Sequence, residues 1–240
     1  VVPGPPTPYF MAVWQQDFGA HPGIVALRLF DDPNTPSRIN LSGSPFQVDV
    51  DASLPGGRNS TRPRITELAP TGVGSGVGGV NRSETYHRVV FEVEADGQKD
   101  IYLVGINLTT VRSTVRITQT PSVETAPVVA YNPLTLRTMV LFERSGSGVR
   151  GQLLGIGETG SLLDLLASDF SLSTGIAPSV ALQRSTDSFF ASAEDATRLG
   201  LGCIAGRRVV GTPSTGTGTG STQPVLSPST AGGLLLGFLR

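Results

Sequence analysis

Three glutamates and one glutamine recur at a single position of an internal repeat, and carboxylates placed in this way can do chemistry. Glu143 lies 51 residues after Glu92, Glu194 lies 51 residues after Glu143, and Gln15 takes the same place earlier in the chain. A ring of carboxylates could bind a cation or supply an acid–base pair. We favour a plainer role, in which each side chain ends a strand by facing solvent or bonding a backbone group, because the recurrence follows from the repeat itself.

The two histidines do not complete a catalytic set. His21 precedes a proline in an expected turn, and His87 lies in an expected strand beside Tyr86. No Gly-x-Ser-x-Gly motif leads into a helix, as the nucleophile of an α/β-hydrolase would require. We therefore predict that the protein is not an enzyme and that it needs no cofactor.

One acidic stretch is similar to the start of a calcium-binding loop. Asp49 and Asp51 alternate as oxygen ligands do in such loops, but Leu54 stands where an EF-hand has its glycine, and the distal glutamate is missing. A polar turn after a strand is the favoured interpretation, with Ca²⁺ as the alternative. Two histidines and one cysteine also make a zinc site improbable.

Four of the six asparagines lie in N-glycosylation sequons, more than the serine and threonine content predicts by chance. The acceptors would be Asn40, Asn59, Asn81 and Asn107. Such sequons are used on exposed segments of secreted proteins. The excess favours a glycosylated protein that is secreted or held at the cell surface.

Composition excludes several partners. The 240 residues carry a net charge of -1, so there is no basic field to attract nucleic acid. No apolar run reaches the roughly 20 residues of a membrane-spanning helix. The content of 30 glycines and 18 prolines is high for a helical protein. The single cysteine rules out an internal disulfide.

The elements that would position these residues are set by the repeat of 51 residues. Seven positions are identical between its two best copies, and they are the pairs Ala126/Ala177, Pro127/Pro178, Val129/Val180, Ala130/Ala181, Glu143/Glu194, Gly151/Gly202 and Gly155/Gly206. One copy predicts four strands, at residues 128–131, 138–143, 149–154 and 169–172. Four antiparallel strands in about 50 residues is the size of a β-propeller blade.

We therefore predict an all-β, β-propeller-like fold of four to five blades. Residues 1–211 form the repeat domain, residues 212–233 a Thr/Gly/Ser/Pro-rich linker, and residues 234–240 an additional strand. Residues 46–50 and 115–118 take the fourth place in the first two units. The first unit lacks its opening strand and the fourth lacks a clear closing strand. Residues 224–226 and 234–238 would begin a fifth unit.

These repeats are similar to the degenerate propeller repeats of large secreted or surface proteins. The resemblance rests on Pro-x-Val-Ala-Tyr-Asn-Pro at 127–133, Val-x-Phe-Glu at 140–143 and Gly-Gln-Leu at 151–153. It covers about residues 8–211 and implies a propeller fold and an extracellular setting. It implies no catalytic residues.

The favoured function is a structural or adhesive module at the cell surface that contacts other proteins. An expected loop at residues 54–83 is the favoured contact segment, and it carries the four arginines Arg58, Arg62, Arg64 and Arg82. The alternative is a carbohydrate-binding or carbohydrate-active propeller. Such sites need aromatic platforms for the sugar rings, and Trp14 is the only tryptophan, which counts against this alternative. A third interpretation is a subunit of a filament, whose open blades dock on a neighbour.

Overall fold

The computed structural model describes most of the chain. The described residues are 9–31, 39–51, 53–66, 87–107, 110–132, 135–155, 164–166, 168–183, 188–195, 198–205, 208–210, 222–228 and 234–239. Throughout these ranges the secondary structure consists of strands and turns, without a helix. It follows that no described helix could cross a lipid bilayer.

The strands form five antiparallel sheets that follow the order of the chain. Sheet 1 contains β1 (Tyr9–Asp17), β2 (Pro22–Asp31) and β3 (Ile39–Gln47). Sheet 2 contains β4 (Asn59–Ile65), β5 (His87–Ala95), β6 (Gln98–Asn107) and β7 (Thr110–Arg116). Sheet 3 contains β8 (Glu124–Asn132), β9 (Arg137–Arg144), β10 (Gly148–Gly155), β11 (Asp164–Leu165) and β12 (Phe170–Ser173). Sheet 4 contains β13 (Ile176–Gln183), β14 (Ser188–Asp195), β15 (Arg198–Ala205) and β16 (Arg208–Val210). Sheet 5 pairs β17 (Thr222–Pro228) with β18 (Leu234–Leu239).

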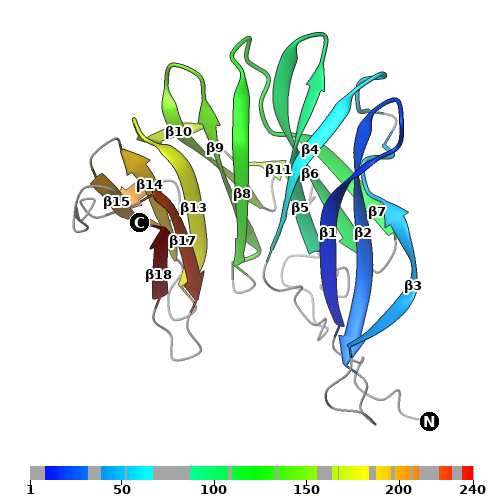
Figure 1. Ribbon diagram of the computed structural model, residues 1–240. Helices are drawn as coiled ribbons and strands as arrows, with labels where there is room; N and C mark the ends of the chain where they lie inside the picture. Colours follow the sequence, from blue (N-terminus) through cyan, green and yellow to red (C-terminus); the bar gives the residue numbers. More distant parts are fainter. Residues whose placement is uncertain are drawn as a thin grey trace.

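The five sheets stand side by side along an open arc, with sheet 1 at one end and sheets 4 and 5 at the other (Figure 1). Each opening strand contacts the opening strand of the next sheet, from β4 to β8, from β8 to β13 and from β13 to β17. The expectation of an all-β fold built from small antiparallel sheets is confirmed.

Inner sheets bury both of their faces, and successive residues of one strand serve opposite interfaces. In β5, Phe91 packs in the apolar cluster between sheets 1 and 2, whereas Val90 packs in the cluster between sheets 2 and 3. In β9, Phe142 faces sheet 2 and Leu141 faces sheet 4. This alternation is what a pleated strand between two neighbours requires, and it explains why the second strands are apolar on both sides.

Each complete sheet opens with the same irregularity. The ladder of β4 with β5 shifts register at Arg62-Pro63, that of β8 with β9 at Ala126-Pro127, and that of β13 with β14 at Ala177-Pro178. The residue before each proline has a positive φ, 52° at Arg62, 52° at Ala126 and 49° at Ala177. These are β-bulges, where proline is tolerated because its position lies outside the regular ladder.

Several predicted boundaries differ from the observed ones. Strand β4 lies inside the segment 54–83 that was expected to be a loop, and β17 lies inside the expected linker 212–233. Sheet 4 has a closing strand, β16, that the sequence did not reveal. The fourth strands of the first two units, β3 and β7, begin earlier than residues 46 and 115.

Candidate functional site

The recurring glutamates occupy one register position in three sheets. Each lies directly opposite the residue that precedes the bulge: Glu92 opposite Thr61, Glu143 opposite Thr125, and Glu194 opposite Ile176. Strand alternation turns these side chains towards the following sheet. The position is therefore set by the bulge of the neighbouring opening strand.

Two of these carboxylates bind the bulge of the next sheet. The backbone N–H of Ala126 donates to Glu92 Oε1 at 2.8 Å, and that of Ala177 donates to Glu143 Oε1 at 2.7 Å. Both bonds join residues 34 positions apart. A bulge displaces a backbone N–H from the strand ladder, and a buried N–H needs an acceptor. Glutamate of one sheet thus caps the bulge of the next.

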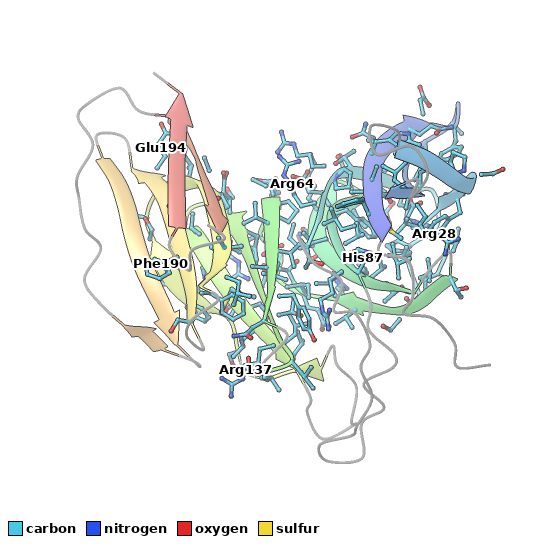
Figure 2. The ribbon with its side chains drawn as sticks, turned by 90° about the horizontal axis from the view of Figure 1, so that it is seen from below. Arg28, Arg64, His87, Arg137, Phe190 and Glu194 are labelled. Carbon is cyan, nitrogen blue, oxygen red and sulfur yellow. The ribbon has the colours of Figure 1, made fainter. Side chains whose placement is uncertain are left out.

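Glu92 is the most enclosed of the four polar positions, with a side chain that is 1% exposed. Its Oε1 also accepts from Arg62 Nη1 at 3.1 Å, and Lys99 Nζ lies 3.9 Å from Oε2. Glu143 and Glu194 are half-buried, and Gln15 is exposed on β1. Figure 2 shows Glu194 on sheet 4, well apart from Arg64 on sheet 2. Since Glu92 and Glu143 bond to different sheets, they do not converge on one ligand.

The four candidate arginines do not share one loop. Arg58 precedes β4 and donates to the carbonyl oxygens of Pro55 and Asp49. Arg62 and Arg64 lie on β4, where both are exposed, and Arg64 Nη1 donates to the Pro63 carbonyl at 3.2 Å. Arg82 lies outside the described residues. The contact loop predicted at 54–83 is thus partly a strand. The strand was not predicted because the polar sequence of β4 lacks an alternation of apolar residues.

Asp49 and Asp51 each accept hydrogen bonds from nearby residues of the chain. Asp49 is buried, and its Oδ1 accepts from the Ile24 N–H at 3.2 Å and from Gln47 Nε2 at 3.0 Å. The hydrogen bond from the Ser53 N–H lowers the pKa of Asp51. Within the described ranges, no three acidic, histidine or cysteine side chains are grouped to hold a metal ion.

The sequon asparagines lie at different places in the sheets. Asn40 is within β3, Asn59 is the first residue of β4, and Asn107 is the last residue of β6. Asn59 Oδ1 is 3.2 Å from His21 Nδ1. Asn81 lies outside the described residues.

The other histidine is part of the protein interior. Burial and the neighbouring Arg88 charge lower the pKa of His87 to about 4. This histidine is therefore neutral at physiological pH. Arg88 is itself fully buried and stacks on the Tyr131 ring, with its guanidinium carbon 3.5 Å from the ring centroid.

A charge network in sheet 3 was not anticipated from the sequence. Arg144 Nε lies 2.9 Å from Glu124 Oε1, and Arg144 Nη2 lies 2.6 Å from Asp169 Oδ2. Arg150 also pairs with Asp169, at 3.0 Å. The Glu124 side chain is 0% exposed. Glu124 on β8, Arg144 on β9, Arg150 on β10 and Asp169, which directly precedes β12, are brought together by the pairing of these four strands.

Sheet 1 differs from the inner sheets because no described sheet packs on one of its faces, where Phe10 is exposed and Val25 is buried. Direct cross-strand pairs place six apolar side chains on that face, and they are Phe10, Ala12, Trp14, Val25, Leu27 and Leu29. The opposite face, with Met11 and Ile24, packs against sheet 2. Phe10 is 56% exposed, whereas its register equivalents Thr138 and Phe189 are at most 2% exposed. This face is the candidate functional surface, and we call it the outer face of sheet 1.

Comparisons with known proteins find a likeness of shape but none of sequence. No protein-family model matches the chain, and no curated protein matches it. Among solved structures, the chain is similar to TolB from Acinetobacter baumannii, with 14% sequence identity and a TM-score of 0.46. The likeness covers 94% of this chain and 47% of the TolB chain, so the chain spans about half the length of that protein.

Proposed function

We propose that this protein is a β-propeller-type repeat module that makes protein–protein contacts in a structural or adhesive role at the cell surface. The observation that carries the proposal is the outer face of sheet 1, where Phe10 is 56% exposed. Inner sheets of the same design bury the equivalent face against a neighbour. An apolar face of this kind gains free energy when a partner covers it.

The propeller-type architecture is supported by how the sheets repeat. Sheets 2 and 4 are four-stranded meanders in chain order, and each opening strand contacts the next. The glutamate caps repeat between sheets 2 and 3 and between sheets 3 and 4. Radially repeated blades provide a rigid frame on which exposed faces and loops can bind partners.

A carbohydrate-active role receives less support from the site. Such a role requires two carboxylates that flank one sugar bond. Glu92 and Glu143 each bond to a backbone N–H of a different sheet. Both carboxylates thus link neighbouring sheets and do not flank a common sugar site. The protein-contact role is therefore the one function proposed.

Photo-crosslinking at position 10 tests the contact role. With a photoreactive phenylalanine in place of Phe10, illumination of the protein on its native cell surface is expected to give a discrete protein adduct. A matched control carries the same residue in place of Val50, which is 57% exposed but follows β3 outside the sheets. Adducts of equal yield at both positions, or none at position 10, would contradict the proposal.

The secreted, glycosylated state is tested by the intact mass of the native protein. A glycan on Asn40, Asn59, Asn81 or Asn107 is expected to add mass that an N-glycosidase removes. Conversion of the glycosylated asparagine to aspartate by that enzyme locates the site by peptide mapping. Native protein with an unmodified mass would contradict glycosylation. It would not bear on the contact role, which the crosslinking experiment tests.

A further inference from the structure

The opening strands of four sheets share a local sequence as well as a bulge. They read Thr61-Arg62-Pro63-Arg64-Ile65, Thr125-Ala126-Pro127-Val128-Val129, Ile176-Ala177-Pro178-Ser179-Val180 and Thr222-Gln223-Pro224-Val225-Leu226. The ladder of β17 with β18 shifts register between Thr222 and Val225, as the other three ladders do at their Xaa-Pro pairs. The common pattern is Thr or Ile, then Xaa-Pro, then any residue, then a branched aliphatic residue.

Sheet 1 has no such strand among the described residues. Its first strand, β1, matches the second strands β5, β9 and β14, because all four contact the opening strand of the following sheet. Strands β5, β9 and β14 each pair on both sides, whereas β2 is the one partner of β1 among the described strands. One edge of β1 therefore presents backbone N–H and C=O groups without a described partner strand, which is a template for strand addition.

The side chains along β1 suit an added strand of the opening type. In the repeat register Trp14 takes the place of Phe142, which lies opposite the bulge at Ala126-Pro127. Val13 takes the place of Leu141, which pairs with Val128. Trp14 is half-buried, and Val13 is partly buried against the cluster between sheets 1 and 2. An added strand would cover both side chains as β8 covers their counterparts.

We propose that the edge of β1 that has no described partner strand binds an extended segment of a partner protein with the sequence (Thr/Ile)-Xaa-Pro-Xaa-(Val/Ile/Leu). Backbone hydrogen bonds would supply the affinity, and the bulge would supply the selectivity. This inference rests on the proposed contact function and specifies the kind of partner segment that is bound. A second copy of this chain is a less suitable occupant, because its opening strands are already paired in hairpins or with β18.

The preferred Xaa follows from the bulge geometry. Arg62, Ala126 and Ala177 adopt φ between 49° and 52° at this position. Such angles strain residues with a side chain but not glycine. A segment with Gly-Pro should therefore bind more tightly than the same segment with Ala-Pro, and replacing proline should matter less than replacing the residue before it.

A peptide with the sequence of residues 124–132 of this chain is the probe. Its addition to the full chain is expected to cause a saturable change in the emission of Trp14, the only tryptophan. Changing Ala126, the peptide residue before proline, to Gly should lower Kd roughly threefold, because the positive φ no longer strains a side chain. Changing that Ala to Val should raise Kd at least tenfold, since a β-branched residue rarely adopts this φ. Calorimetry on the same peptides checks affinity independently of the fluorophore.

A photoreactive residue in place of the peptide tyrosine locates the bound strand. Tyr131 pairs with Thr138, the register equivalent of Phe10, so adducts are expected on β1 at or next to Phe10. A scrambled peptide of the same composition is the matched control. Equal binding of the scrambled peptide, no binding by the 124–132 peptide, or adducts confined to β18 would overturn the proposal. So would a concentration-dependent dimer that excludes the peptide, because a second copy would then be the occupant.

The two proposals fail in different ways. A partner adduct at position 10 on the cell surface, combined with no peptide binding, would overturn strand addition and keep the contact function. Peptide binding at β1, combined with no cell-surface adduct, would keep strand addition as a property of the edge and overturn the proposed contact role.

Discussion

Replacing Glu92 with alanine is expected to lower the free energy of unfolding by about 2–4 kcal/mol, because a charged acceptor is removed from a buried position. The carboxylate is 1% exposed and accepts the Ala126 N–H at 2.8 Å. It also pairs with Arg62 and Lys99. The variant loses a bond between sheets 2 and 3 and leaves the bulge N–H without its acceptor. Urea unfolding followed by far-UV circular dichroism measures the change.

Glu94→Ala is the matched control for this experiment. Glu94 lies two residues further along β5, is 40% exposed, and pairs with Lys99 at 3.4 Å. An exposed pair of this kind contributes little, so the control should change stability by less than about 1 kcal/mol. Glu92→Gln keeps a carbonyl oxygen for the Ala126 N–H and should fall between the two. If Glu92→Ala were no more destabilising than Glu94→Ala, the capping role would be wrong.

The repeat allowed the glutamates to be aligned, but it did not show what they bind. Glu92, Glu143 and Glu194 share one register position, as the spacing of 51 residues suggested. Their partners are backbone N–H groups that bulges in another sheet remove from the strand ladder, and a bulge has only a weak sequence signal. Here that signal is the Ala-Pro pair at the start of the two best copies of the repeat.

Strand β4 shows why one opening strand was missed. Its residues Asn59–Ile65 are mostly polar or charged, with only Ser60 buried, so the alternation of apolar residues that marks a strand is missing. Pairing with the apolar strand β5 and the ion pair between Arg62 and Glu92 hold it in the sheet. Tertiary contacts thus decide the structure of a segment whose own sequence favours a loop.

The outer face of sheet 1 could not be predicted from the sequence either. Trp14 takes the position that Phe91 and Phe142 occupy in β5 and β9, where that position is buried, and only the order of the sheets shows that one face of sheet 1 has no described neighbour. The missing opening strand of the first unit was nevertheless apparent from the repeat. Its consequence, an edge of β1 without a described partner strand, follows once β1 is seen to pair with β2 alone in the part of the chain that the structure describes.

Replacing Arg144 with leucine is expected to have the largest effect on stability, a loss of about 3–5 kcal/mol, because it leaves a buried carboxylate without its counter-charge. The Glu124 side chain is 0% exposed and lies 2.9 Å from Arg144 Nε. After the substitution Glu124 would retain only the hydroxyl of Thr120 as a described side-chain partner. Thermal and urea unfolding of the purified variant measure the loss.

Two further variants separate the buried charge from general damage to sheet 3. Arg150→Leu removes a cation that is 21% exposed and whose described ion pair is with Asp169, so a loss near 1 kcal/mol is expected, typical of partly exposed pairs. Combining Arg144→Leu with Glu124→Gln should restore part of the lost stability, because the buried group is then neutral. A double variant less stable than Arg144→Leu alone would contradict this explanation.

The same network predicts how stability depends on pH. Burial raises the pKa of Asp169, but the hydrogen bonds and charges of Arg150 and Arg144 outweigh it and hold the pKa below its usual 3.8. A carboxylate whose pKa is lower in the folded state stabilises the protein fully above the unfolded pKa and loses that contribution as pH falls through the folded value. Stability should therefore decline below about pH 4, and the decline should be shallower in an Asp169→Asn variant. An acid-unfolding curve of Asp169→Asn with the same slope as the wild type would show that Asp169 does not contribute, because that variant has no carboxylate to protonate at this position.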